Sequence, residues 1–172
     1  MKKIILLGYM GSGKSTIGKL LSNKVAIPHF DLDEIIEKRT HSSISELFSV
    51  KGELYFRKLE HAILEELMAS PEAMIISLGG GTPCYANNHL WLQNEQVVSV
   101  YLKANLDTLF QRLLHDKKYR PILATLKDEE LKEFMAKQLF ERSYYYQHAQ
   151  HVLNVDNQSE EALVSAIEKI LA

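Results

Sequence analysis

The sequence is poor in three features that would each indicate a different class of protein: cysteine, long apolar runs and net charge. Cys84 is the single cysteine, which excludes an internal disulfide and fits a reducing compartment, so we expect a small buried or half-buried thiol in a cytoplasmic protein. No apolar run reaches the roughly 20 residues that a helix needs to span a bilayer. The formal net charge of −2 gives no bulk attraction to nucleic acid or to anionic membranes. We therefore expect a monomer with neither nucleic acid nor a membrane as its partner.

Apolar runs alternate with helical patterns along the 172 residues, a length that suits one domain. Strands are predicted over residues 3–7, over a short run ending at Asp31, and over 74–78, 96–102 and 152–155. Helices are predicted over 14–25, 33–69 with a break near Gly52, 106–115, 128–147 and 159–171, with Ser43 and Glu46 as a capping box. This alternation predicts a three-layer α/β sandwich with a parallel sheet, in which 33–69 and a loop near 116–126 are excursions.

Residues 8–16 read GYMGSGKST and match the phosphate-loop pattern G-x-x-x-x-G-K-[ST], between a predicted strand and a predicted helix. In this motif the backbone N–H groups and the helix N-terminus surround the phosphates of a nucleotide. Lys14 then reaches the β- and γ-phosphates, and the Ser15 hydroxyl binds Mg²⁺. The predicted nucleotide-binding residues of the loop are Gly11, Ser12, Gly13, Lys14, Ser15 and Thr16.

A phosphate loop alone does not name a reaction. A GTPase needs an N-K-x-D motif, and the nearest stretch, NKVA, lacks the aspartate; the chain is also too short for a transport ATPase, which leaves small-molecule kinases. Asp31 and Asp33 follow the second predicted strand, at the sheet edge where ligands bind. One carboxylate can serve Mg²⁺ through water and the other can accept a proton from an attacking hydroxyl. The alternative is that Asp33 only caps the helix that follows.

The chain has few arginines, five among 20 basic residues, so each can mark a place where a rigid guanidinium fork matters. Arg57 has Glu53 four residues before it and Glu60 three residues after it, which predicts either a surface ion pair or an arginine that Glu60 holds for an acidic ligand. The triplet 79–81, Gly-Gly-Gly, follows the third predicted strand. It indicates either a close approach of the backbone to a ligand or a strained turn.

The chain resembles shikimate kinase. The stretches that carry the resemblance are GYMGSGKSTIGKLL, FDLDEIIE, ISELFSVKGELYFRKLE, LGGGT, RPIL and RSYYYQHA, in the family's order and approximate spacing. The resemblance implies a nucleoside-monophosphate-kinase-like fold, strand order 2-3-1-4-5, over a single kinase domain at 1–172. It implies transfer of the γ-phosphate of ATP to the 3-hydroxyl of shikimate, in the chorismate pathway of aromatic amino acid biosynthesis. The alternatives are a kinase for gluconate or a nucleoside monophosphate, and an ATP-binding module without catalysis.

The resemblance also implies roles for particular residues. Shikimate would be bound by Asp33, Arg57, Gly79, Gly80, Gly81 and Arg142. Asp31 would serve Mg²⁺ through its water shell, and Arg120 would lie in a lid over the ATP phosphates, so that Lys14, Asp33 and Arg120 form the catalytic set. The lid has Ile122 where the family usually has Leu, and Leu113 stands where an arginine usually flanks the adenine. Arg112 is the nearest candidate for that contact.

Overall fold

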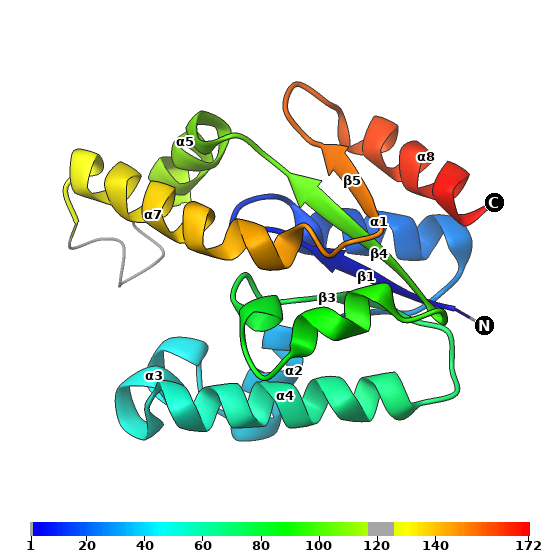
Figure 1. Ribbon diagram of the computed structural model, residues 1–172, viewed down its shortest axis with the longest axis horizontal. Coiled ribbons are helices and arrows are strands. Elements are labelled where there is room, and N and C mark those ends of the chain that lie inside the picture. Colours follow the sequence, from blue (N-terminus) through cyan, green and yellow to red (C-terminus); the bar gives the residue numbers. More distant parts are fainter. Residues whose placement is uncertain (1, 117–125) are drawn as a thin grey trace.

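A computed structural model describes residues 2–116 and 126–172. A five-stranded sheet forms the centre of the molecule. The strands are β1 (Lys3–Leu7), β2 (His29–Asp31), β3 (Ile75–Ser77), β4 (Val97–Lys103) and β5 (His151–Asn154). Every pairing is parallel, and the strand order is β2-β3-β1-β4-β5 (Figure 1). The order implied by the resemblance is therefore confirmed.

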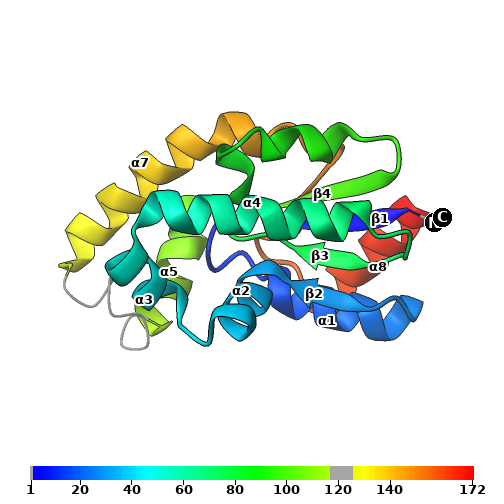
Figure 2. The same ribbon diagram turned by 90° about the horizontal axis from the view of Figure 1, so that it is seen from below.

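Helices cover both faces of the sheet (Figure 2). They are α1 (Lys14–Val25), α2 (Leu32–Thr40), α3 (Ile44–Lys51), α4 (Glu53–Ala69), α5 (Leu106–Asp116), α7 (Asp128–Tyr146) and α8 (Glu160–Leu171), with short 3₁₀ helices η1 (Thr82–Cys84) and η2 (Asn88–Gln93). Helices α1 and α8 pack together on one face, and η2 and α7 lie on the other. Within residues 2–116 and 126–172, no helix combines the length and the apolar character that crossing a membrane requires.

The central strands form the core because both of their faces are covered. Every residue of β1 is buried, and β4 is buried except for Lys103 at its end. This explains why these strands read as continuous apolar runs without a period of two. The arrowheads of β1 and β4 point toward the end of the molecule where α3, α5 and α7 lie (Figure 1). Polar residues that follow the strands are thereby brought to one edge.

The excursion between β2 and β3 contains three helices rather than the one interrupted helix that was predicted. The break near Gly52 is confirmed: its φ of 85° separates α3 from α4. The capping box is also confirmed, since the Ser43 hydroxyl accepts from Glu46 N while the Glu46 carboxylate accepts from Ser43 N. The capping box marks a second break, before α3: α2 ends at Thr40, and His41 after it takes the left-handed conformation, with φ 51°, that commonly terminates a helix.

The segment between β3 and β4 was not predicted to be helical, yet it carries η1 and η2. Both are short, and the glycine triplet and Pro83 remove the 3.6-residue periodicity by which a helix is recognised. The segment packs against α4 and β4. Of the loop predicted near 116–126, Asp116 ends α5, and residues 117–125, which include Arg120, lie outside the described residues.

Candidate active site

The loop between β1 and α1 has the geometry of a phosphate cradle. Gly11 and Gly13 have φ of 83° and 99°, and Gly13 is the N-cap of α1. No side chain in the described part of the protein caps this helix, so its first N–H groups point into the loop. Such an N-terminus, uncapped and at the end of a buried strand, is the arrangement that binds phosphate.

Lys14 lies inside this cradle. Its Nζ donates to Gly8 O at 2.8 Å and to Tyr9 O at 3.0 Å, so the ammonium sits over the loop carbonyls. The side chain of Ser12, by contrast, is buried against Gly8, where a Cβ would lie 2.7 Å from Ser12 Oγ. Ser12 therefore contributes its backbone to the cradle, while Lys14 supplies the positive charge.

Asp31 joins the phosphate loop to the start of α2. The Ser15 hydroxyl donates to Asp31 Oδ2, and Asp31 Oδ1 accepts from Asp33 N at 3.0 Å and from Glu34 N at 3.2 Å. Asp31 is thus the N-cap of α2, and the alternative in which Asp33 has that role is wrong. The cap lies one residue before the helix, and α2 begins at Leu32.

The oxygens of Ser15 and Asp31 suit Mg²⁺, a hard cation that binds oxygen ligands. Among the described residues, no group of three or more His, Cys, Asp or Glu side chains could hold a metal ion. In kinases Mg²⁺ usually binds through one or two protein oxygens, water and substrate phosphates. The residues present therefore fit a magnesium ion that arrives with the nucleotide.

Asp33 lines a cavity together with Lys14 and the first glycines of the triplet. Burial, followed by the negative charges of Asp31 and Glu60, raises the pKa of Asp33 to about 6, against a smaller opposing effect of Lys14. A carboxylate with this pKa is ionised at pH 7 and is more basic than an ordinary aspartate. Asp33 is therefore free of the capping role and poised for acid–base chemistry.

Each glycine of the triplet faces one of the residues predicted to bind the acceptor. A Cβ added to Gly79 would lie 3.0 Å from Asp33 Oδ1, and one added to Gly80 would lie 3.2 Å from Arg142 Nη1. A Cβ added to Gly81 would lie 2.6 Å from Arg57 Nη2, so the guanidinium would have to shift. The triplet thus lets a carboxylate and two guanidinium groups converge on bare backbone, rather than serving only as a turn.

Arg57 is held on α4 by aromatic and acidic neighbours. Its Nη1 donates to Glu60 Oε1 at 2.9 Å, and its guanidinium lies 4.0 Å from the centre of the Tyr85 ring. The side chain of Arg57 is 12% exposed and that of Glu60 is 1% exposed, so this pair is buried rather than at the surface, while the half-exposed Glu53 Oε1 lies 3.6 Å from Arg57 Nε. The geometry favours an arginine that a buried carboxylate holds for an acidic ligand.

Helix α7 contributes Arg142 and a residue that sequence reasoning missed, Tyr146. The Tyr146 hydroxyl donates to Gly80 O at 2.5 Å, and burial raises the pKa of Tyr146 far above its ordinary value. Arg142 and Tyr146 are four residues apart, so they share one face of α7. The signal was available in RSYYYQHA, but three successive tyrosines do not show which one faces the site.

Among the described residues, two cavities adjoin the phosphate loop and share Gly11, Gly13 and Thr16 in their linings. The smaller, about 240 Å³, is lined by Lys14, Ser15, Asp31, Asp33, Gly79 and Gly80, among others. The larger, about 680 Å³, is lined by Gly11, Gly13, Thr16, Arg112, Gln158 and Leu163, among others. Arg112 is fixed at its wall, since Nη1 donates to Gly11 O at 2.8 Å. Sequence reasoning did not identify Gln158 or Leu163, which come from the segment between β5 and α8 and from α8 itself.

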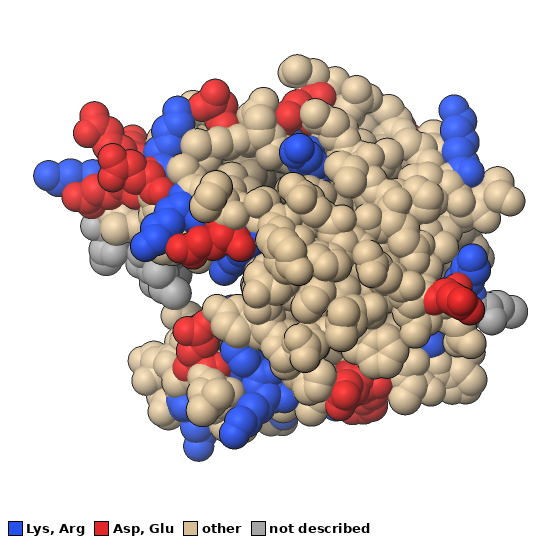
Figure 3. All heavy atoms as spheres, viewed as in Figure 1, with Lys and Arg blue, Asp and Glu red and all other residues tan. Residues whose placement is uncertain are grey.

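The shape of the surface and the position of Cys84 agree with the location of the candidate site. The space-filling view shows a hollow between α7 and the α3–α4 pair, with charges of both signs around it (Figure 3). Cys84 lies half-buried nearby, and burial raises the pKa of its thiol to about 11. The expectation of a small buried or half-buried thiol is confirmed, since this cysteine stays protonated and lacks the activation that a nucleophile requires.

Comparisons with known proteins agree with the geometry. The family model for shikimate kinase matches residues 10–172. Shikimate kinase of Flavobacterium johnsoniae is 59% identical over 172 residues, which is 100% of both chains. The crystal structure of shikimate kinase from Bacteroides thetaiotaomicron has a TM-score of 0.90 and 38% identity over 99% of this chain and 98% of that one. Shikimate kinase from Acinetobacter baumannii in complex with shikimate has a TM-score of 0.88 and 28% identity, over 99% and 93% of the two chains. The phosphate cradle, the glycine triplet with its converging arginines, and these likenesses together show that the chain belongs to the shikimate kinase family.

Proposed function

We propose that the protein transfers the γ-phosphate of ATP to the 3-hydroxyl of shikimate, in the pathway to chorismate and the aromatic amino acids. The observation that carries the proposal is the convergence of Asp33, Arg57 and Arg142 on the glycine triplet beside the phosphate loop. One basic carboxylate and two guanidinium groups suit an acceptor that has both hydroxyls and a carboxylate. Shikimate has both.

On the nucleotide side, the loop residues Gly11, Ser12, Gly13 and Thr16 would surround the phosphates through their backbone N–H groups. Lys14 would leave the loop carbonyls for the β- and γ-phosphates and neutralise charge as it builds up in the transition state. The adenine would occupy the larger cavity, with Arg112 at its wall.

On the acceptor side, a flat ring would lie against the bare backbone of the triplet, with its carboxylate on Arg57 and Arg142. Asp33 would orient the attacking hydroxyl and accept its proton, which a pKa of about 6 permits at neutral pH. Since the protein mainly positions groups in phosphoryl transfer, the convergence of these side chains is the greater part of its contribution.

Ser15 and Asp31 would hold Mg²⁺, Ser15 directly and Asp31 through a bound water molecule. When bound, the ion would supply positive charge that offsets the negative charge of the phosphates. The proposed lid residue Arg120 would add positive charge to the same phosphates, and closure of the lid would exclude water.

We also propose that the protein works as a monomeric, single-domain enzyme of the cytoplasm. The single cysteine supports a reducing compartment, and the length of the chain supports one domain. Gel filtration with light scattering would test the monomer, and a dimer at micromolar concentration would contradict it.

The test of the function is a coupled ADP-release assay with ATP, Mg²⁺ and a single acceptor at a time. Shikimate should support turnover, while gluconate and a nucleoside monophosphate should not. The other kinase readings are weaker because a nucleoside monophosphate lacks the carboxylate that Arg57 and Arg142 would bind, and gluconate lacks the flat ring that would lie against the triplet. ATP binding without turnover of shikimate would refute the proposal.

A further inference from the structure

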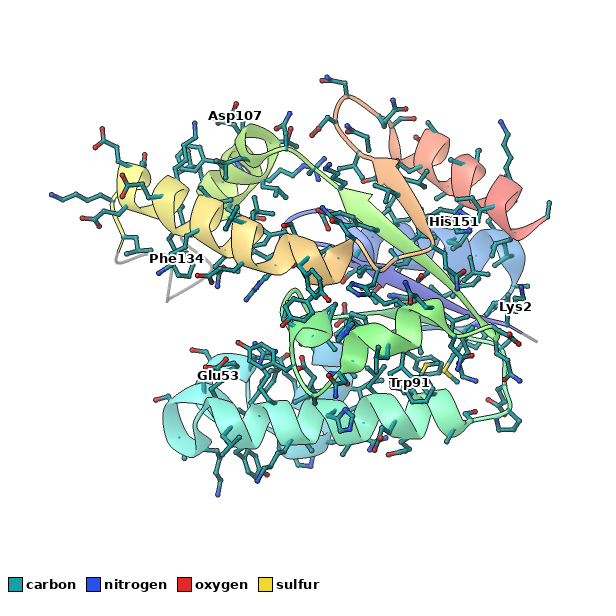
Figure 4. All side chains as sticks on the ribbon, viewed as in Figure 1. Lys2, Glu53, Trp91, Asp107, Phe134 and His151 are labelled. Atoms are coloured by element: carbon teal, nitrogen blue, oxygen red, sulfur yellow. The ribbon has the colours of Figure 1, made fainter. Side chains whose placement is uncertain are left out.

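Behind the glycine triplet, a chain of buried polar groups joins Arg57 to the η1–η2 segment. Helix α4 and η1 are in contact, and Figure 4 shows η2, marked by Trp91, lying along α4. Thr82 and Asn88 are buried polar residues of this segment, 0% and 1% exposed. Buried polar groups are costly unless they are paired, so the partners of these two residues indicate what the segment does.

Thr82 and Arg57 hold Glu60 from opposite sides. The Thr82 hydroxyl donates to Glu60 Oε2 at 2.8 Å, while Arg57 Nη1 donates to Glu60 Oε1 at 2.9 Å. Each carboxylate oxygen therefore has its own donor. Glu60 is buried, so neither oxygen can exchange its partner for water at no cost.

Asn88 in turn holds Thr82. Its Nδ2 donates to Thr82 O at 3.0 Å, which leaves Oδ1 to accept from His61 Nδ1 at 2.6 Å. His61 lies on α4 next to Glu60, and its Nε2 is 3.3 Å from Glu65 Oε1. The chain of contacts thus begins and ends on α4, and it fixes the residue after the triplet relative to that helix.

One edge of the Arg57 guanidinium makes no hydrogen bond within the described residues, although the half-exposed Glu53 Oε1 lies 3.6 Å from its Nε. Within the described residues, its one hydrogen bond is the one from Nη1 to Glu60, and its buried Nε has no hydrogen-bond partner. Nη2 points at the triplet, 2.6 Å from where a Cβ of Gly81 would lie. The Nε–Nη2 edge is therefore the edge that can bind a ligand carboxylate with two parallel hydrogen bonds.

We propose that Thr82 and Asn88 are positioning residues, which keep Glu60 on Nη1 alone and so leave the Nε–Nη2 edge of Arg57 open for the acceptor's carboxylate. The inference rests on the proposed function. A carboxylate and a guanidinium prefer to pair through two parallel bonds. If the hydroxyl of Thr82 were removed, Glu60 Oε2 would lose its donor and would compete with the substrate for Arg57.

The test compares Thr82→Val, which removes the hydroxyl at similar volume, with Thr82→Ser, which keeps it. We expect Thr82→Val to raise the KM for shikimate about 5- to 30-fold, the effect of losing a charge-assisted hydrogen bond, with kcat and the KM for ATP unchanged. Thr82→Ser should restore the parent KM. Thr40→Val is the matched control, because the Thr40 hydroxyl donates to Ile36 O within α2, and it should change nothing.

The methyl ester of shikimate provides a readout that a merely structural role would not move. It lacks the charged carboxylate, so Thr82→Val should leave kcat/KM for the ester close to that of the parent. An equal loss for shikimate and its ester, or an equal rise in the KM for ATP, would overturn the inference. If Thr82→Val fails to fold, Asn88→Ala provides the same comparison with a smaller expected rise, about 2- to 5-fold, because it weakens the support of Thr82 by one neutral hydrogen bond.

The two proposals fail in different ways. If the parent does not phosphorylate shikimate, the proposed function fails. If the parent is active and a folded Thr82→Val variant keeps the parent KM for shikimate, the positioning role alone is wrong.

Discussion

Replacement of Asp33 by asparagine should lower activity and raise stability at the same time. The carboxyl is buried near Asp31 and Glu60, and these surroundings raise its pKa from 3.8 to about 6. Asparagine keeps the shape and a hydrogen-bonding oxygen but accepts no proton. The substitution therefore removes the proposed base together with a negative charge that the fold accommodates poorly.

The two magnitudes follow from the same environment. General-base catalysis contributes about 10²- to 10⁴-fold, and the loose transition state of phosphoryl transfer needs little help from a base, so we expect kcat to fall about 10²- to 10³-fold. The pKa of Asp33 is higher in the folded protein than in the unfolded chain, so its contribution to stability is fully present below pH 4 and is lost as the pH rises through about 6. A shift of about two units corresponds to at most about 3 kcal/mol, which Asp33→Asn should recover at pH 8.

The assay measures kcat at saturating ATP and shikimate from pH 5 to 9, with thermal unfolding on the same samples. The parent should lose activity as the pH falls through about 6, when Asp33 takes up a proton, and the variant should lack that inflection. The unfolding temperature of Asp33→Asn should exceed that of the parent at pH 8 and approach it at pH 4. Asp107→Asn is a matched control, because Asp107 is 79% exposed and pairs with Lys132 at the surface.

Three results would refute this reasoning. A loss of kcat below threefold or so would make Asp33 a structural residue, since general bases contribute far more. If the variant kept an inflection near pH 6, a group other than Asp33 would be its cause. A lower unfolding temperature at pH 8 would mean that the ionised carboxylate stabilises the fold.

Other substitutions test the remaining assignments. Lys14→Ala should abolish transfer while the circular dichroism spectrum stays that of the parent, because the ammonium would act on the β- and γ-phosphates. Activity within about tenfold of the parent would contradict the phosphate-loop role. Arg57→Ala and Arg142→Ala should each weaken shikimate binding about 10- to 150-fold, as expected for the loss of a charge-assisted bidentate bond, and leave the affinity for ATP unchanged. Calorimetry measures both affinities. A loss of ATP affinity with shikimate affinity intact would make both assignments wrong. Asp31→Asn should raise the Mg²⁺ concentration needed for half-maximal rate. If excess Mg²⁺ rescued the Asp33→Asn variant instead, Asp33 would be the residue that serves the metal and Asp31 the proton acceptor.

The sequence by itself determined the features that depend on short stretches of chain. Residues 8–16 show the phosphate loop because a strand, a glycine-rich turn and a helix follow one another there. The continuous apolar run of β1 predicts burial on both faces, and Ser43 with Glu46 predicts the start of α3. In each case the interacting groups lie within a few residues, so their spacing alone fixes the geometry.

Resemblance extended the prediction to residues far apart in the chain. Asp33, Arg57 and Arg142 were assigned to one site because they match a family pattern, and the structure brings all three to the glycine triplet. Without that pattern, nothing in the spacing of these residues shows that α2, α4 and α7 meet at the same edge of the sheet. The role of Arg120 stays a prediction, since it lies outside the described residues.

Only the tertiary structure decided which atoms of these residues are engaged and which are open. From the sequence, Asp33 was the candidate for the cap of α2, and the choice of Asp31 instead depended on where β2 ends and how the Ser15 hydroxyl approaches it. The hydrogen bond between Thr82 and Glu60 joins residues 22 positions apart, and that of Tyr146 with Gly80 O joins residues 66 apart. Such pairs form because packing brings two elements together at one register, and a local sequence pattern carries no record of that register.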